Sequence, residues 1–137
     1  MIKEISVFFP AFNEERNIYN TVIKAREVLC SSFENWEIII VNDGSSDSTC
    51  LEVKKLEQLD SRIKSITHPT NRGYGAAFKS GVYNCRFSWI SFTDSDGQFD
   101  FSEVARFIKA QEETGADLVV GYYLRRSVRI YRKLNTF

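Results

Sequence analysis

Residues 36–48, WEIIIVNDGSSDS, decide the fold. Trp36 to Val41 form a short, mostly apolar run rich in β-formers, which is typical of a buried strand. Asn42 to Ser48 is a cluster of Asn, Asp, Gly and Ser, residue types that favour turns. Three leucines mark a helix after this turn: Leu51, Leu56 and Leu59. The stretch therefore predicts a buried strand, a polar turn and a helix in succession.

The same unit precedes this stretch. Ile5 to Phe9 is another short apolar run, which we expect to end at Pro10. Asn13 is a candidate N-cap, and Glu14 and Glu15 would suit the positive first turn of the helix that follows. Apolar residues at helical spacing mark the buried side of this helix: Ile18, Val22, Ala25 and Leu29.

The alternation continues toward the C-terminus. Further strands are predicted at Arg62–Thr67, Trp89–Thr93 and Leu118–Val120, and further helices at Ala76–Asn84 and from an N-cap at Ser102 to Gly115. Strands that alternate with helices predict a Rossmann-like α/β fold, with a mostly parallel sheet and helices on both faces. Such a sheet binds ligands at the carboxyl ends of its strands. We expect this domain to span residues 1–121.

The composition excludes several classes of protein. With 137 residues, of which 43% are hydrophobic, the chain suits one globular domain, and its formal net charge of zero does not favour nucleic acid as a partner. Three cysteines without C-x-x-C spacing indicate neither a disulfide framework nor a zinc site. The first apolar run is too short for a signal peptide or a membrane span, so we expect a cytoplasmic protein.

The clearest chemical signal is Asp94-Ser95-Asp96-Gly97-Gln98, directly after a predicted strand. If the segment is extended, Asp94, Asp96 and Gln98 can share one side of it, because alternate residues of a strand point the same way. Their oxygen atoms suit Mg²⁺ or Mn²⁺, and such an ion would neutralise a nucleotide diphosphate. Asp and Gly are also favoured in turns for backbone reasons alone, which leaves a purely structural role open.

Two further features invite a function. Gly73 to Phe78 falls short of a dinucleotide fingerprint because Phe78 replaces the third glycine, so we interpret it as flexible backbone near phosphate, with Arg72 as an anion contact, or simply as a tight turn. His68 is the only histidine, and we expect it to be structural. No serine or cysteine has an evident histidine partner, which argues against nucleophilic triad chemistry.

Residues 122–137 form a basic, amphipathic tail. It holds five cations and no acid: Arg125, Arg126, Arg129, Arg132 and Lys133. Aromatic and aliphatic residues lie between them, so the tail could be a solvated face, a phosphate-recognition surface or a segment that lies on a membrane.

Four motifs together resemble the inverting family-2 glycosyltransferases of GT-A fold across nearly the whole chain. They are residues 7–15 (VFFPAFNEE), 39–47 (IIVNDGSSD), 71–77 (NRGYGAA) and 93–98 (TDSDGQ). Gln98 and the arginines after Gly121-Tyr122 resemble the polyprenyl-phosphate hexose transferases of dolichyl-phosphate mannosyltransferase type. Two departures are Phe12, where tyrosine is common, and Tyr123, where arginine is frequent.

The resemblance implies a role for each matching residue. The nucleotide would be bound by Pro10, Phe12, Glu14 and Asp43. Asp94 and Asp96 would be the catalytic residues and would hold the metal together with Gln98. Arg126 and Arg132 would face an acceptor phosphate. Arg72 and Gly73 complete the expected nucleotide site. Family members continue past this length, so residues 122–137 would begin an acceptor region that the chain lacks.

The expected function is transfer of a hexose from a GDP- or UDP-sugar to an acceptor with inversion. The expected acceptor is a polyprenyl phosphate at the cytoplasmic face of a membrane, with the chain in peripheral contact. An alternative is a truncated, non-catalytic module that binds nucleotide sugars. A nucleotidyltransferase is disfavoured, because the first turn lacks a Gly-rich loop containing Arg or Lys.

Overall fold

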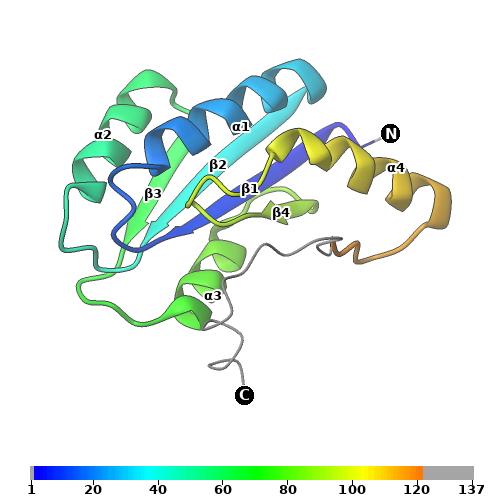
Figure 1. Ribbon diagram of the computed structural model, residues 1–137. Coiled ribbons are helices and arrows are strands. Elements are labelled where there is room, and N and C mark those ends of the chain that lie inside the picture. Colours follow the sequence, from blue (N-terminus) through cyan, green and yellow to red (C-terminus); the bar gives the residue numbers. More distant parts are fainter. Residues whose placement is uncertain (1, 122–137) are drawn as a thin grey trace, which may run out of the picture. The chain divides into compact units, whose positions relative to one another are not determined.

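A parallel sheet of four strands forms the centre of the computed structural model, which describes residues 2–121. The strands are β1 (Glu4–Ala11), β2 (Asn35–Asn42), β3 (Ile63–Thr67) and β4 (Ile90–Phe92), in the spatial order β3-β2-β1-β4. All three pairings are parallel. Each strand therefore ends at the same edge of the sheet, as the alternation of strands and helices predicts (Figure 1).

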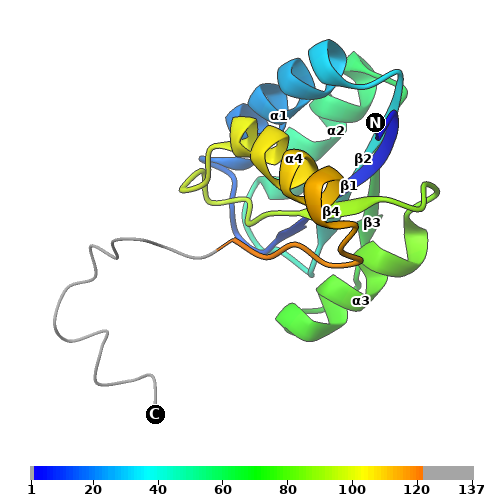
Figure 2. The same cartoon turned by 90° about the vertical axis from the view of Figure 1, so that its right-hand side faces the viewer.

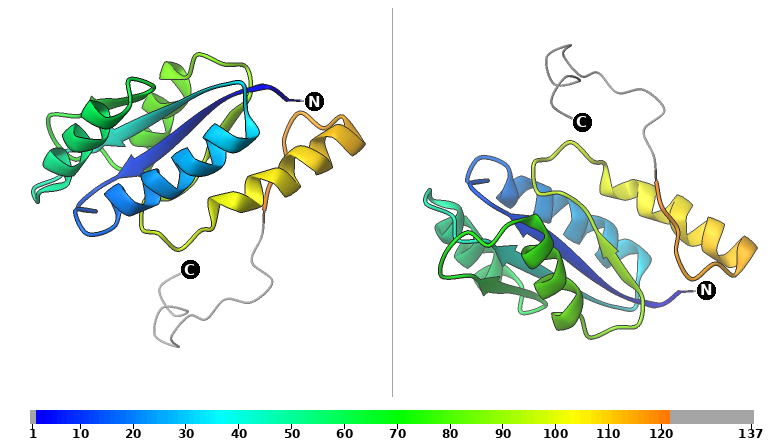
Figure 3. Two further views of the ribbon diagram at one scale, coloured as in Figure 1. Left: turned by 90° about the horizontal axis from the view of Figure 1, so that it is seen from above. Right: turned by 90° about the horizontal axis from the view of Figure 1, so that it is seen from below.

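Helices cover both faces of this sheet. Helices α1 (Ile18–Ser32) and α2 (Thr49–Leu59) pack on one face and contact each other, whereas α3 (Tyr74–Asn84) packs against β1 and β2 from the other face (Figures 2 and 3). The predicted Rossmann-like α/β class is confirmed. Ile18, Val22, Ala25 and Leu29 are all fully buried, as their helical spacing predicts.

The core between the sheet and α3 is built around Phe8. This side chain is fully buried and packs against Ile39, Val41 and Ala77. Its ring stacks on Phe92 at a centroid distance of 5.5 Å. A Cβ atom at Gly81 would overlap the ring of Phe8, so the glycine inside α3 permits close approach of helix and sheet.

The end of the first strand differs from the prediction. β1 does not stop before Pro10 but continues to Ala11, with Pro10 in register with Val41. The Ser6 N–H and the Phe8 carbonyl form their hydrogen bonds on the β4 side of the strand. The backbone nitrogen of Pro10, two residues further on, lies on the same side. Since β4 ends opposite Phe8, the missing N–H of Pro10 costs no hydrogen bond between strands.

The start of the first helix is also later than predicted. α1 begins at Ile18 after Asn17, so Asn13 is not its N-cap and Glu14 and Glu15 are not in its first turn. Asn13 instead adopts a left-handed conformation, with φ of 54°. Asparagine tolerates that region because its short side chain can bond locally, and here the bonds go to the neighbouring loop.

The helix that the three leucines predicted is α2, and only one of those leucines is buried. Thr49, Val53 and Leu56 are buried, whereas Leu51 and Leu59 are more than half exposed. The buried residues follow the spacing i, i+4, i+7, which places them on one helical face. Leu51 and Leu59 lie off that face.

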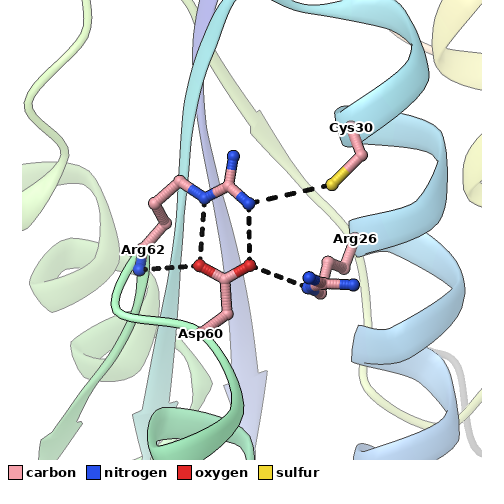
Figure 4. A network of polar contacts seen from close by, with 4 residues as sticks. All are labelled: Arg26, Cys30, Asp60 and Arg62. Carbon is pink, nitrogen blue, oxygen red and sulfur yellow. Dashed lines mark hydrogen bonds and ion pairs between the residues drawn. The ribbon is translucent and has the colours of Figure 1, made fainter.

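An ionic network centred on the buried carboxylate of Asp60 joins both helices of this face to β3. Asp60, just after α2, accepts hydrogen bonds from Arg26 of α1 at 2.8 Å and from Arg62 at 2.8 and 3.0 Å (Figure 4). The Arg62 guanidinium also lies 3.8 Å from the centroid of the Trp36 ring and donates to Cys30 Sγ. These bonds to Arg62 and Arg26 hold the pKa of Asp60 far below its ordinary value despite burial.

The described chain divides into two compact units, one up to Val104 and the other from Ala105 on. A 3₁₀ turn at Phe101–Glu103 leads into α4 (Val104–Thr114). Asp100, not Ser102, caps this turn, because its side chain accepts from the Ser102 N–H. Gly115 follows the helix with φ of 66°, which confirms its predicted role in ending it.

The predicted fifth strand is wrong. Residues 118–120 are not in a strand, and Leu118 and Val120 are 77% and 71% exposed. An apolar run becomes a strand only where a neighbouring strand can pair with it, and this run has no such partner among residues 2–121.

No helix within residues 2–121 is long and apolar enough to cross a bilayer. The predicted basic tail, residues 122–137, lies outside the described part.

Candidate functional site

Four loops meet at the carboxyl edge of the sheet, and hydrogen bonds link them in a closed ring. They are residues 12–17 after β1, 43–48 after β2, 68–73 after β3 and 93–100 after β4 (Figure 1). Two of the links join one loop to the next, and the other two run from the loop after β4 to Tyr74 at the start of α3 and to Pro10 and Thr21 of β1 and α1. Residues that lie far apart in the sequence are thereby held in one place.

The loops after β1 and β2 are joined through Asn13. Its side-chain oxygen accepts from the Ser46 N–H at 2.8 Å, and its own N–H donates to Ser45 Oγ at 3.0 Å. The Glu14 N–H donates to Thr49 Oγ1 at 2.9 Å, which fixes the loop against the start of α2. Phe12 lies beside these contacts with 47% of its surface exposed.

Asp43 joins the loop after β2 to the loop after β3. Its Oδ1 accepts from the Arg72 N–H at 2.9 Å and contacts His68 Nδ1 at 2.6 Å, and its Oδ2 accepts from the Gly73 N–H at 2.8 Å. Burial alone would raise the pKa of this carboxyl, but the bonds from His68, Arg72 and Gly73 outweigh burial and lower it. Asp43 is therefore an anion that holds the glycine loop.

His68 has a serine partner that the sequence did not reveal. Its Nε2 lies 2.8 Å from Ser80 Oγ on α3, while Nδ1 contacts Asp43. The statement that no serine has a histidine partner is wrong, because twelve residues of loop and helix bring Ser80 back over His68. His68 is 5% exposed, so it bridges the loop and the helix from inside the protein, in keeping with the expected structural role.

Asp94 and Tyr74 link the loop after β3 to the loop after β4. The Tyr74 hydroxyl, at the start of α3, donates to Asp94 Oδ1 at 3.2 Å. Burial of Tyr74 and the neighbouring Asp94 charge raise the pKa of the tyrosine. No sequence pattern indicates this contact, since the two residues are twenty positions apart.

Ser95 closes the ring between the loop after β4 and the end of β1. Its side chain is buried, and its hydroxyl donates to the Pro10 carbonyl at 2.8 Å. The Ser95 carbonyl accepts from Thr21 Oγ1 at 3.3 Å. No role for Ser95 was predicted from its place between Asp94 and Asp96. A serine flanked by two aspartates carries no pattern that distinguishes an anchor from a spacer.

The segment that holds Asp94 and Asp96 was predicted to be extended, but it forms a turn. Ser95 and Asp96 lie in the turn, Gly97 has φ of 76°, and Asp96 Oδ1 accepts from the Gln98 N–H at 3.0 Å. Ser95 is buried and bonded to Pro10, whereas Asp94 and Asp96 on either side of it are partly exposed.

The two carboxylates remain suited to a hard divalent cation. Each is partly exposed, each uses one oxygen in the hydrogen bonds above, and neither forms an ion pair with a residue in the described range. Residues 2–121 contain no group of three or more His, Cys, Asp or Glu side chains arranged for a metal. Mg²⁺ sites often hold one or two carboxylates and complete their shell with water and substrate phosphate, so two acids fit this chemistry.

The structure thus gathers the predicted donor-site residues on linked loops. Those on the ring or at the ends of its strands are Pro10, Phe12, Glu14, Asp43, Arg72, Gly73, Asp94, Asp96 and Gln98. Arg126 and Arg132, predicted to face an acceptor phosphate, lie outside the described residues.

Solved structures with this fold include two glycosyltransferases. The mannosyltransferase PcManGT from Pyrobaculum calidifontis, solved with GDP-Man and Mn²⁺, has a TM-score of 0.68 at 18% identity, over 78% of this chain and 32% of its own. Glucosyl-3-phosphoglycerate synthase from Mycobacterium tuberculosis, solved with Mn²⁺, UDP and phosphoglyceric acid, has a TM-score of 0.61 at 21% identity, over 82% of this chain and 39% of its own. At these identities the likeness shows the fold alone.

Sequence comparison identifies the family. The undecaprenyl-phosphate 4-deoxy-4-formamido-L-arabinose transferase of Salmonella choleraesuis (strain SC-B67) is 32% identical over 133 residues, which are 96% of this chain and 40% of the relative. The chain therefore spans two fifths of the length of this relative. The family described as Glycosyl transferase family 2 matches residues 6–135. With its parallel sheet and the linked loops at the carboxyl edge, the chain belongs to glycosyl transferase family 2.

Proposed function

We propose that this chain binds the nucleotide diphosphate sugar of a hexosyltransferase, with a GDP- or UDP-hexose as donor. The observation that carries the proposal is the closed ring of four loops, which leaves Asp94 and Asp96 free of ion pairs with the described residues at the edge where parallel sheets bind ligands. Relatives solved with GDP-Man and with UDP support the donor class.

Each loop of the ring would contribute one part of the nucleotide site. The exposed ring of Phe12 offers an apolar face for the base, and Pro10 and Glu14 lie on either side of it in the chain. Asp43 is buried and its oxygens are occupied, so its main contribution would be to hold Arg72 and Gly73 in place. The Arg72 side chain is exposed and would face the diphosphate.

Asp94 and Asp96, with Gln98, would hold Mg²⁺ or Mn²⁺ together with the diphosphate. When bound, the ion would neutralise the charge of the leaving nucleotide diphosphate. Asp94 is oriented by the Tyr74 hydroxyl and Asp96 by the Gln98 N–H, so both carboxylates are already directed before the donor binds. Two relatives were solved with Mn²⁺, which supports this choice of metal.

The acceptor in this proposal is a polyprenyl phosphate at the cytoplasmic face of a membrane. The relative from Salmonella is an undecaprenyl-phosphate transferase by its name, which supports a lipid-linked acceptor. A phosphate is already an anion at neutral pH, so it can attack the sugar with inversion without a protein base. Arg126 and Arg132 would face that phosphate, and the basic tail would contact the membrane surface.

Calorimetric titration with a panel of nucleotide sugars tests the donor site. We expect one base to bind in the presence of Mn²⁺, and binding to be lost with chelator or in an Asp96→Ala variant. Asp100→Ala is the matched control, since Asp100 follows in the same loop but caps the 3₁₀ turn. Binding that is unaffected by Asp96→Ala, or equal in both variants, would contradict the assignment of the metal site.

A further inference from the structure

The segment between Asp60 and Asp94 has a charge imbalance that the neutral chain as a whole conceals. It contains no acidic residue and five cations: Arg62, Lys64, Arg72, Lys79 and Arg86. Arg62 pairs with Asp60, and Arg86 lies 3.8 Å from Glu37. Lys64, Arg72 and Lys79 form no ion pair with any residue in the described range. Two of these three cations lie on or just before α3.

Helix α3 lies on the face of the sheet opposite α1 and α2 (Figure 3). A pocket of about 280 Å³ lies along this helix. Its lining comes from Arg72, two residues before the helix, and from one side of the helix: Ala76, Lys79, Ser80, Tyr83 and Asn84. Both unpaired cations of this region line it, and no acidic side chain does. The pocket therefore has an uncompensated positive charge of two.

Two polar side chains of the pocket are held in place by hydrogen bonds. Ser80 Oγ lies 2.8 Å from His68 Nε2, and Asn84 Nδ2 donates to the Ser80 carbonyl at 2.8 Å. Lys79 Nζ lies 5.7 Å from the centroid of the Tyr83 ring, a weak cation–π contact that an anion could readily replace. Tyr83 itself is 76% exposed and adds an apolar surface at the rim.

We infer that this pocket binds a phosphate group, at a site separate from Asp94 and Asp96. An arginine fork and a lysine point charge are the two cations that proteins use for phosphate, and a tetrahedral anion can accept from both at once. The pocket shares Arg72 with the proposed donor site, whereas Lys79 lines only the pocket, so a test at Lys79 distinguishes the two sites.

Binding of inorganic phosphate to the 137-residue chain tests the pocket. In ¹H–¹⁵N NMR spectra at constant ionic strength, we expect saturable shifts of the Lys79, Ser80 and Asn84 amide signals with phosphate and none with chloride. Lys79→Gln should weaken this binding by about tenfold, the effect of losing one charge-assisted hydrogen bond. Lys54→Gln, an exposed lysine of α2 on the other face, is the matched control and should change nothing.

A second measurement distinguishes a soluble phosphate from a lipid headgroup. Co-sedimentation is compared for phosphatidylcholine vesicles with and without phosphatidylglycerol. Binding to the anionic vesicles that Lys79→Gln reduces and Lys54→Gln does not would identify a headgroup, whereas phosphate binding without vesicle binding would identify a soluble ligand. Either result supports the site. The inference is overturned if neither phosphate nor anionic vesicles bind, or if Lys79→Gln weakens neither kind of binding. Either result holds whatever the outcome at the donor site.

Discussion

Asp43→Asn tests whether a buried carboxylate holds the glycine loop. The carboxylate accepts from three groups, with His68 Nδ1 and the Arg72 N–H on Oδ1 and the Gly73 N–H on Oδ2. An asparagine of the same shape has one acceptor oxygen. If that oxygen takes the position of Oδ1, the Gly73 N–H faces an amide N–H and loses its bond.

The expected cost follows from this geometry. A buried donor left without an acceptor costs about 1–3 kcal/mol, and the two remaining bonds weaken because their acceptor is no longer charged. We therefore expect Asp43→Asn to lower the free energy of unfolding by about 2–4 kcal/mol. The chain should also bind nucleotide sugar more weakly, since Arg72 and Gly73 are no longer fixed.

Chemical denaturation of the chain and of the variant measures this cost. The folded-state pKa of Asp43 is lowered, so the advantage of the native residue is present above the unfolded pKa, near 4, and declines as the pH falls through the folded value. Asp100→Asn is the control, because Asp100 is exposed and asparagine caps equally well. If Asp43→Asn costs no more than Asp100→Asn at neutral pH, the reasoning is refuted.

Two further predictions concern the core and the ionic network. Gly81→Ala should destabilise the chain by about 1–3 kcal/mol in chemical denaturation, because the new methyl group would overlap the buried ring of Phe8; a change below about 0.5 kcal/mol would contradict this packing. Asp60→Asn should cost about 1–3 kcal/mol at neutral pH, since Arg26 and Arg62 lose a charged acceptor at partly exposed positions. Because the pKa of Asp60 is lowered, that difference should shrink as the pH falls below about 4, and a difference that is constant down to pH 2 would show that the carboxylate charge is not responsible.

The residues alone were enough to predict the fold class and the edge of the sheet at which the candidate residues gather. The mostly apolar runs at 5–9 and 36–41 are buried on both faces of the sheet. Burial of a strand depends mainly on the hydrophobicity of its residues, which can be taken directly from the sequence. The topology of parallel sheets then places polar residues after each strand at one edge, without further information. The D-x-D segment and the glycine loop could therefore be predicted to lie at the same edge of the sheet.

The tertiary structure decided everything that depends on a partner distant in the sequence. Pro10 could remain in β1 only because β4 ends early beside it, and residues 118–120 are not a strand because no neighbour among residues 2–121 pairs with them. The contacts from Asp43 to Gly73, from His68 to Ser80 and from Ser95 to Pro10 are bonds between side chains and loops that folding brings together. A hydrogen bond needs two groups within about 3 Å, and a sequence states the groups but not the distance between them.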